Sequence, residues 1–260
     1  MVAFFTDAYN ILVKYYPFLL RGIGYTMLIA LVGTVAGLLI GLATGMVRTC
    51  PMSKNPVVRF LQKVVNGIIA VYVEVFRGTP MMVQAMVIYW GYAFASGGQT
   101  LELIPSGILI VSINTGAYMA EIVRGGIISI DKGQFEGAYA VGMTHSQAML
   151  HVILPQVLRN ILPSVANEFV INIKDTSVLN VIGVTELYYF AGVIKKQSFQ
   201  TFETYLVVCV IYFILTFTVT RLLRLVEKKL QITDSFVICG SQSDPNAEIR
   251  VQRQPEVPHD

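Results

Sequence analysis

Residues 22–47 read GIGYTMLIALVGTVAGLLIGLATGMV. This stretch contains no Asp, Glu, Lys or Arg and lies between Arg21 and Arg48. A bilayer core of about 30 Å is crossed by roughly 20 helical residues, so this stretch is long enough to span a membrane. Similar gaps in charge occur between Arg77 and Glu102, between Glu102 and Glu121, and between Glu203 and Arg221. The sequence therefore predicts an integral membrane protein of several helices.

The composition supports this class and excludes others. Of the 260 residues, 54% are hydrophobic and 13% are charged, against about 25% charged in soluble domains. The net charge of +3, with no basic cluster among aromatics, argues against nucleic acid as a partner. The three cysteines (Cys50, Cys209 and Cys239) have unrelated spacings, which predicts neither a metal site nor a disulfide framework.

The apolar segments predict an all-α fold with five spans and polar ends. The expected spans are residues 22–47, 64–97, 105–123, 153–173 and 204–223. Residues 1–21 are expected to form an N-terminal segment outside the membrane, with a short interfacial helix ending near Pro17. Residues 174–203 are expected to be a mixed loop, and residues 231–260 a disordered tail after a membrane domain at 22–230.

The second span is interrupted by Glu74, Arg77, Gly78 and Pro80. Proline removes a helical hydrogen bond and clashes with the preceding turn, so we expect one long, kinked helix here. Two separate segments remain the alternative.

The distribution of Lys and Arg predicts the orientation, because cytoplasmic loops carry the excess of basic residues. With five spans, the 48–63 loop, the 124–151 stretch and the C-terminal end share one side, and that side is much richer in Lys and Arg. This places the N-terminus outside and the C-terminus in the cytoplasm.

Small residues recur every four positions in the first span, at Gly33, Gly37, Gly41 and Gly45. Lipid gives helices no hydrophobic reason to associate, so close backbone packing at small residues holds membrane bundles together. We interpret the stripe as helix packing; a pore-lining face is the alternative.

A short amphipathic segment, Gly133-Gln134-Phe135-Glu136-Gly137-Ala138-Tyr139-Ala140-Val141-Gly142-Met143, lies between the third and fourth spans. Its two or three turns would be marginal as an isolated helix. Docking of its apolar face into a groove on a partner would stabilise it. The alternative is a helix lying on the membrane surface.

This segment resembles the loop of ATP-binding-cassette (ABC) importer permeases that reads Glu-Ala-Ala, three residues, Gly, nine residues, then Ile-x-Leu-Pro. Here the matching residues are Glu136, Gly137 in place of the first Ala, Ala138, Gly142, and the ending Val152-Ile153-Leu154-Pro155. Three other stretches resemble the polar amino acid branch of that family: Phe76-Arg77-Gly78-Thr79-Pro80, residues 116–126, and Lys174-Asp175-Thr176-Ser177-Val178.

The resemblance implies a type I importer permease in the bacterial inner membrane, with a five-helix core and a cytoplasmic coupling helix at about 134–148. Glu136, Gly137, Ala138, Gly142, Leu154 and Pro155 would make or support the contact with the ATPase. The implied partners are ABC ATPase subunits, a second permease subunit (identical or homologous), an extracytoplasmic substrate-binding protein, membrane lipid and an amino acid substrate.

The chain lacks a phosphate-binding Gly-x-x-x-x-Gly-Lys-Ser/Thr loop. We therefore expect no cofactor on this chain, no enzymatic activity of its own, and use of ATP and Mg by the partner ATPase.

Ionised side chains at bilayer depth are costly and are candidates for function. A zwitterionic amino acid needs a cation for its carboxylate and an anion for its ammonium group. Arg77 and Asp175 would supply these charges, and Thr176, Ser177 and Asn114 would add hydrogen bonds. Snorkelling of Arg77 and Asp175 to an interface is the alternative, and Glu121 is expected to pair with Arg124 on its own helix.

Two other function classes remain as alternatives to the importer. An ATP-independent secondary carrier or channel would be expected to show internal repeats or a carbonyl-lined filter, and neither is found. A membrane enzyme would need a grouping of His, Cys and carboxylates that the sequence does not assemble.

Overall fold

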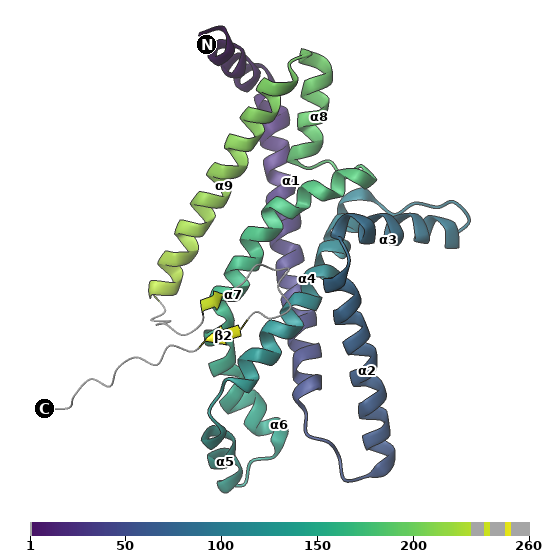
Figure 1. The fold of residues 1–260 in the computed structure, drawn as a ribbon, viewed down its shortest axis with the longest axis vertical. Coiled ribbons are helices and arrows are strands. Elements are labelled where there is room, and N and C mark those ends of the chain that lie inside the picture. The colour runs from purple at the N-terminus through teal and green to yellow at the C-terminus, as the bar shows by residue number, and fades with distance from the viewer. Residues whose placement is uncertain (1, 230–236, 240–247, 251–260) are drawn as a thin grey trace, which may run out of the picture.

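The computed structural model describes residues 2–229, 237–239 and 248–250. Its helices are α1 (Val2–Thr49), α2 (Pro56–Gly78), α3 (Met81–Ala95), α4 (Leu103–Ile128), α5 (Lys132–Ala140), α6 (His145–Ala148), the π-helical turn η1 (Met149–Ile153), α7 (Leu154–Asp175), the 3₁₀ helix η2 (Thr176–Ile182), α8 (Leu187–Ser198) and α9 (Thr201–Lys229). Figure 1 shows α1 running along the bundle, with α8 near one end and α5 and α6 near the other.

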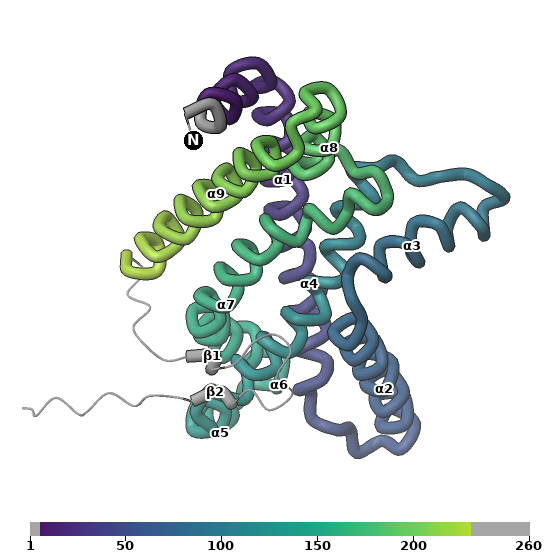
Figure 2. The backbone as a smooth tube through the Cα atoms, turned by 45° about the horizontal axis from the view of Figure 1, so that its top comes forward, coloured from purple at the N-terminus to yellow at the C-terminus, as the bar shows by residue number. Residues whose placement is uncertain are grey.

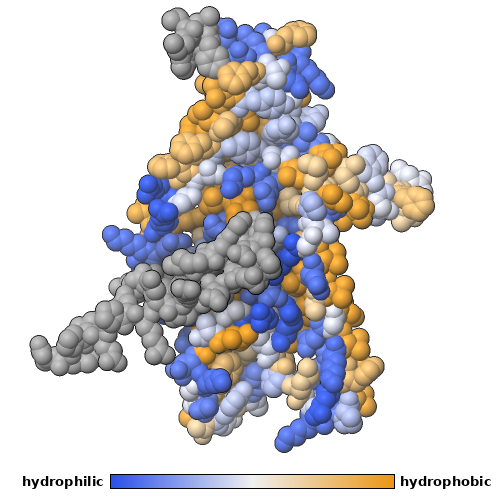
Figure 3. Space-filling view, viewed as in Figure 1, coloured by the Kyte–Doolittle hydropathy of each residue, from blue (hydrophilic) through white to orange (hydrophobic). Residues whose placement is uncertain are grey.

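Among the residues that the structure describes, five helical segments are long and apolar enough to cross a membrane, which confirms the predicted number of spans. They are Thr6–Thr49, Pro56–Gly78, Leu103–Ile128, His145–Ile182 and Thr201–Lys229. Hydrophobic residues cover the outer surfaces of α2 and α9 in Figure 3, as expected of helices that face lipid.

The first helix is longer than predicted. Residues 2–21 do not form a separate interfacial helix ending near Pro17, because Pro17 lies inside the continuous helix α1. At 1.5 Å per residue, a helix of 48 residues is about 72 Å long, well over the bilayer core. The prediction was wrong here because proline in a helix can be tolerated where neighbouring helices support the chain, and Tyr15 and Leu19 pack on α8 and α9 in the core.

The second predicted span is two helices, not one kinked helix. After α2 ends at Gly78, Thr79 and Pro80 are extended, and α3 leaves the bundle in a different direction in both Figure 1 and Figure 2. The Gln84 side chain holds this break, since its Nε2 donates to the Phe76 carbonyl (2.8 Å) and to the carbonyl and hydroxyl of Thr79 (both 2.9 Å). The break is thus an anchored corner of the fold.

The four glycines of α1 pack against α4, which supports the packing interpretation. A Cβ on Gly37 would lie 2.8 Å from Thr115 Cβ, and one on Gly45 would lie 2.7 Å from Val123 Cγ1. Gly33 and Gly41 face Val111 and Met119 in the same way. Because α4 presents a residue to each glycine at the same four-residue interval, the two backbones approach closely along their length.

The predicted loop at 174–203 is largely helical, so that expectation was wrong. It contains η2 and α8, and the apolar face of α8 (Leu187, Ala191 and Ile194) is buried against α1 and α9. Glu186 begins α8, where its carboxylate accepts hydrogen bonds from the Tyr189 and Tyr188 amides (2.7 and 2.9 Å). A polar cap and an amphipathic face therefore make a helix from a segment with no membrane-length apolar run.

Beyond α9, the structure describes only two short strands, β1 (Val237–Cys239) and β2 (Glu248–Arg250), which pair antiparallel. The rest of the tail predicted to be disordered, 231–260, lies outside the described residues.

Candidate functional site

A small polar cavity lies where the α2–α3 break meets α4 and the C-terminal half of α7. Its volume is about 130 Å³, enough for about four waters at roughly 30 Å³ each or for one small solute. The cavity is lined by Thr79, Pro80, Met81, Asn114, Tyr118, Glu168, Ile171, Asn172 and Asp175. Two carboxylates, two amides and a phenol thus meet in one space between three helices.

The structure brings together part of the predicted substrate set. Asn114 and Asp175 line the cavity, and the Arg77 guanidinium lies 5.6 Å from the ring centroid of Tyr118, another lining residue. A cation and an anion therefore flank the same small space.

Two predicted residues lie elsewhere. Thr176 is fully buried, and its hydroxyl donates to the Ile173 carbonyl (3.0 Å). Ser177 lines a separate cavity with Lys174 and Tyr188. The 3₁₀ turn that begins after Asp175 directs these neighbours away from the polar cavity.

Sequence reasoning missed Tyr118 and Gln84. Tyr118 lines the cavity, and buried Gln84 joins the α2–α3 corner to α4 because its Oε1 accepts from Asn114 Nδ2 (2.8 Å). Both lie in stretches without ionised residues, whereas the candidates were chosen mainly by ionised side chains at bilayer depth. A buried amide following a proline break was the available signal, since a buried polar side chain needs a partner.

Asn172 ties three spans together beside the cavity. Its Nδ2 donates to the Thr34 hydroxyl of α1 (2.8 Å), and its Oδ1 accepts from the Thr115 hydroxyl of α4 (3.1 Å). Buried amide networks of this kind fix the relative positions of membrane helices.

Glu121 is a structural residue, as predicted. Its carboxylate pairs with Arg124 (2.8 Å) and also with Arg48 at the end of α1. It therefore fastens α1 to α4, away from the polar cavity.

The second candidate region is the short segment after α4. It was predicted as one helix over 134–148, but it forms two helices, α5 and α6, separated by a turn at 141–144. Gly142 has φ +83°, the Gly142 amide donates to the Tyr139 carbonyl (3.0 Å), and the Met143 amide donates to the Ala138 carbonyl (3.1 Å). This is the Schellman pattern that ends a helix on a left-handed glycine.

Side chains hold α5 and α6 against each other. The Phe135 and His145 rings are stacked with centroids 6.4 Å apart, and the Tyr139 hydroxyl is 2.9 Å from His145 Nδ1. A capping box between Thr144 and Gln147 starts α6. The segment is therefore a defined two-helix unit, which we call the docking segment (residues 131–148).

The docking segment is fixed to the bundle on one face and open on the other. Ala138 is buried, and Phe135 packs beside Met149 and Ile153 of η1. Glu136 and Gly137 are exposed on α5. Leu154 and Pro155 form the first turn of α7, where proline loses no helical hydrogen bond.

Within the part of the chain that the structure describes, no group of three or more His, Cys, Asp or Glu side chains is arranged to hold a metal ion.

The chain is similar to curated transport proteins over most of its length. It is 37% identical over 216 residues to the glutamine transport system permease protein GlnP of Escherichia coli K12, covering 83% of this chain and 94% of that protein. It is 36% identical over 218 residues to the L-cystine transport system permease protein TcyB of Bacillus subtilis 168, covering 84% and 88%.

Solved structures share the fold. An amino acid ABC transporter crystallised with histidines matches with a TM-score of 0.71 and 35% identity, over 84% of this chain and 96% of that chain. The methionine ABC transporter in an inward-facing conformation matches with a TM-score of 0.62 and 18% identity, which shows the fold alone. These matches confirm the predicted all-helical importer-permease fold and a transporter subunit whose ATPase is a separate subunit.

Residues 37–232 match the family described as binding-protein-dependent transport system inner membrane component. That range includes the polar cavity, the docking segment and four of the five spans in full. With more than half of its length matched, the chain belongs to this family of inner-membrane transport components.

Proposed function

We propose that this chain forms the translocation pathway of an ATP-driven importer for polar amino acids and works by alternating access. The polar cavity at the α2–α3 corner carries the proposal, since it places carboxylates, amides and a nearby guanidinium between three spans. The names of the similar proteins, which include glutamine and L-cystine transport permeases, favour the same substrate class.

In this site Arg77 is the partner for the substrate carboxylate, and Asp175 is the partner for the substrate ammonium group. Charge-assisted hydrogen bonds of this kind are roughly twice as strong as neutral ones. Asn114 and Tyr118 add neutral hydrogen-bonding groups on the α4 side. Arg77 is exposed, so its carboxylate contact forms at the mouth of the cavity.

The docking segment is the contact for the ATPase. Its exposed face includes Glu136 and Gly137, whereas its opposite face is packed on η1, which leads directly into α7. Because α7 also lines the polar cavity, a movement of the docking segment is transmitted to the substrate site along one helix. ATP and Mg act on the ATPase subunits, and an extracytoplasmic binding protein delivers the amino acid.

The complete importer contains a second permease subunit, identical or homologous to this one, and two ATPase subunits. In this arrangement the docking segment and the C-terminus are cytoplasmic and the N-terminus is outside, following the excess of Lys and Arg near the docking segment.

Reconstitution with its ATPase and binding protein, followed by uptake of labelled amino acids into vesicles, tests the function. Asp175→Asn is expected to reduce uptake by about tenfold to a hundredfold while the subunits still assemble, since a hydrogen bond to a charged group is worth about 1.5–3 kcal/mol. Ser177→Ala is the matched control, because Ser177 lies two residues away and lines another cavity.

Uptake at the normal rate by Asp175→Asn would remove that residue from the site. Uptake by vesicles that contain this chain alone would instead support the secondary carrier or channel and refute the importer.

A further inference from the structure

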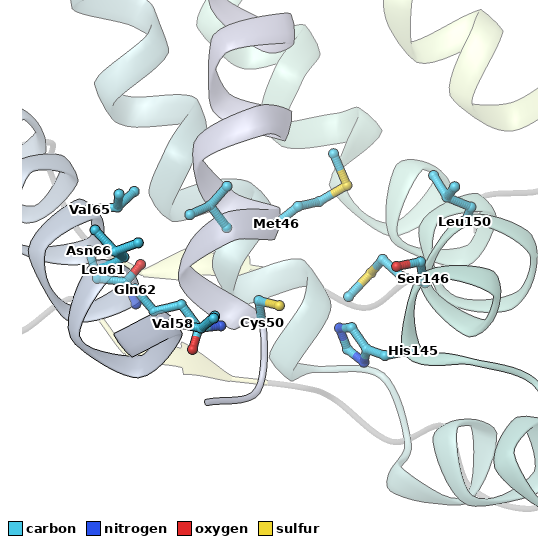
Figure 4. A pocket seen from close by; sticks show the side chains of 12 residues that line it. Met46, Cys50, Val58, Leu61, Gln62, Val65, Asn66, His145, Ser146 and Leu150 are labelled. Atoms are coloured by element: carbon cyan, nitrogen blue, oxygen red, sulfur yellow. The ribbon is translucent and has the colours of Figure 1, made fainter. Parts of the chain in front are cut away.

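A cavity with an apolar lining lies outside the polar site, at the docking-segment end of the bundle. It has a volume of about 500 Å³ and lies between the end of α1, the first half of α2, and α6 with η1. Figure 4 shows Met46 of α1 and Cys50, the residue after α1, between the α2 side chains and those of His145, Ser146 and Leu150. We call this cavity the lateral groove.

The walls of the lateral groove are apolar, as in a site that binds a hydrocarbon chain. Seven of the twelve lining residues are aliphatic or methionine: Met46, Val47, Val58, Leu61, Val65, Met149 and Leu150. Flexible methionines and branched side chains adapt to an irregular apolar occupant. The α2 side of the groove adjoins a helix whose large apolar residues are exposed along its length, including Phe60, Ile68 and Val71, so the groove continues into a lipid-facing surface.

One polar atom in the groove lacks a partner. Asn66 Oδ1 is buried and accepts no hydrogen bond. By contrast, Gln62 is engaged with the Ser53 amide (2.8 Å) and the Pro51 carbonyl (3.2 Å), and His145 is engaged with Tyr139. Leaving a buried acceptor unsatisfied costs about 1–3 kcal/mol, so the occupant is expected to bring a hydrogen-bond donor.

The end of α2 that supplies one wall of the groove is basic. Lys54, Arg59 and Lys63 do not line the groove, but they are exposed on the preceding loop and the first turns of α2, and no Asp or Glu occurs between Arg48 and Glu74. Arg48 is occupied by Glu121, whereas Arg59 uses its Nε to reach the Ser53 carbonyl (3.0 Å), which holds the guanidinium beside the loop. A negatively charged group is therefore favoured at this end.

We propose that the lateral groove binds an anionic phospholipid with a hydroxyl-bearing headgroup. The acyl chain occupies the apolar walls, a headgroup hydroxyl donates to Asn66 Oδ1, and the phosphate lies near Lys63 and Arg59, one and two turns before Asn66 on α2. Lys54 adds positive charge at the surface. Such a lipid would contact α1, α2 and the docking segment at once, so it would brace the segment proposed to meet the ATPase. This site is separate from the polar cavity and goes beyond the proposed transport function.

Binding is tested on the full-length chain purified with its ATPase, using phosphatidylglycerol, with phosphatidylcholine as the neutral lipid. Native mass spectrometry counts retained lipid, and a phosphatidylglycerol with a diazirine on its acyl chain reports the contact site. Cross-links are expected on residues 46–50, 58–66 and 145–150, with preference for phosphatidylglycerol.

Two sets of variants separate this site from ordinary boundary lipid. Replacing Lys54, Arg59 and Lys63 by Gln is expected to reduce phosphatidylglycerol retention by about fivefold for each basic residue lost, and Val65→Trp is expected to fill the groove and block cross-linking. Lys195→Gln with Lys196→Gln is the control, since these residues lie on α8 at the other end of the molecule. Retention should be unchanged in that control.

A chemical probe gives an independent measurement. Cys50 lines the groove and Cys209 lies on α9, and both are free and exposed. With Cys239 replaced by Ser, phosphatidylglycerol should slow alkylation of Cys50 and leave that of Cys209 unchanged.

Cross-links spread evenly over α2 and α9, or unaffected by the Gln and Trp variants, would mean boundary lipid only and would overturn the proposal. Cross-linking of the groove to a second copy of the chain or to the ATPase would assign it to a protein partner and would also overturn it. Neither outcome bears on amino acid uptake, which is measured separately.

Discussion

Single residues decide how closely the first and third spans pack. Gly37 and Gly24 lie on the same helix, but a Cβ at Gly37 would lie 2.8 Å from Thr115 Cβ and 3.1 Å from the Gly116 nitrogen, whereas a Cβ at Gly24 would meet nothing within 4 Å. Gly37→Ala is therefore expected to destabilise the protein by about 1–3 kcal/mol, the usual cost of overpacking. Gly24→Ala should be neutral or stabilising, because alanine is the better helix former.

Thermal unfolding of the two variants in the same detergent checks this expectation. Equal melting temperatures for both would contradict close α1–α4 packing at Gly37 and would favour the pore-lining interpretation of the glycine stripe.

Glu186 gives the connection between the fourth and fifth spans a dependence on pH. Its side chain is fully buried, and burial raises the pKa of the carboxyl above its ordinary value of 4.5, although the Tyr188 amide, the Tyr212 hydroxyl and the Tyr189 amide oppose the shift. Because the folded protein holds this proton to higher pH than the unfolded chain does, the contribution to stability is fully present below pH 4.5 and is lost as the pH rises through the raised pKa.

The melting temperature in detergent should therefore fall as the pH is raised from 4.5 through the raised pKa of Glu186. Glu186→Gln keeps an acceptor for the helix cap and cannot ionise, so its melting temperature should depend less on pH. An identical pH dependence in the two proteins would show that another group is responsible.

Residue-scale prediction from the sequence worked where a local rule was sufficient. The i, i+3 spacing of Glu121 and Arg124 predicted their pairing, and the four-residue glycine interval predicted a close helix contact. The substrate set was harder to predict because Asp175, Thr176 and Ser177 are adjacent in the sequence but point into different surroundings once a 3₁₀ helix begins. Tyr118 lines the polar cavity because α4 packs beside α7, and no pattern within either segment predicts that contact.

At the scale of elements, the docking segment depends on the turn that divides it. Gly142 has φ +83°, where other residues are strained by about 1–2 kcal/mol, and its turn carries the two hydrogen bonds that end α5. Gly142→Val is expected to misplace α6 relative to α5 and thereby to weaken ATPase binding and uptake. Gly137→Ala is the control, because Gly137 is helical with nothing within 4 Å of an added Cβ and alanine stabilises a helix by about 1 kcal/mol.

Co-purification of the ATPase with each variant measures the effect. Normal recovery of the ATPase with Gly142→Val would argue that the turn is not needed for docking. Loss of the ATPase with Gly137→Ala would show that binding depends on the exposed surface of α5 and not on the geometry of the turn.

Helices were predicted correctly where the length of an apolar run defines them, and incorrectly where packing against other helices defines them. The spans in α1, α4 and α9 follow from long runs without charge, whereas those at Pro56–Gly78 and His145–Ile182 contain ionised residues such as Arg59 and Arg159. The helix α8 was missed because its apolar residues are few and are buried only by α1 and α9, and the separate direction of α3 follows from the Gln84 contacts at the corner. Tertiary contacts that join distant segments have no signature within either segment alone.

At the scale of the whole molecule, the proposed mechanism requires the polar cavity and the docking segment to be mechanically connected. The α7 helix makes this connection, since it begins beside η1 and the docking segment and its C-terminal half lines the cavity. Asn172 on the same helix is bonded to α1 and α4. A displacement of α7 relative to α1 and α4 must therefore rearrange the Asn172 hydrogen bonds, and it moves the α7 wall of the cavity against two helices that pack closely along the glycine stripe.

This arrangement works only if the docking segment lies in the cytoplasm, where ATP is available. Because α4 is the span between them, the α3–α4 connection and the docking segment must lie on opposite sides of the membrane. In a background with all cysteines replaced, Gly97→Cys should react with an impermeant maleimide in intact spheroplasts, and Lys132→Cys should react only in inside-out vesicles. Both positions are exposed, so neither result depends on unfolding. Labelling of Lys132→Cys from outside would place the docking segment beyond the reach of any ATPase, and α7 would then have no motor to move it.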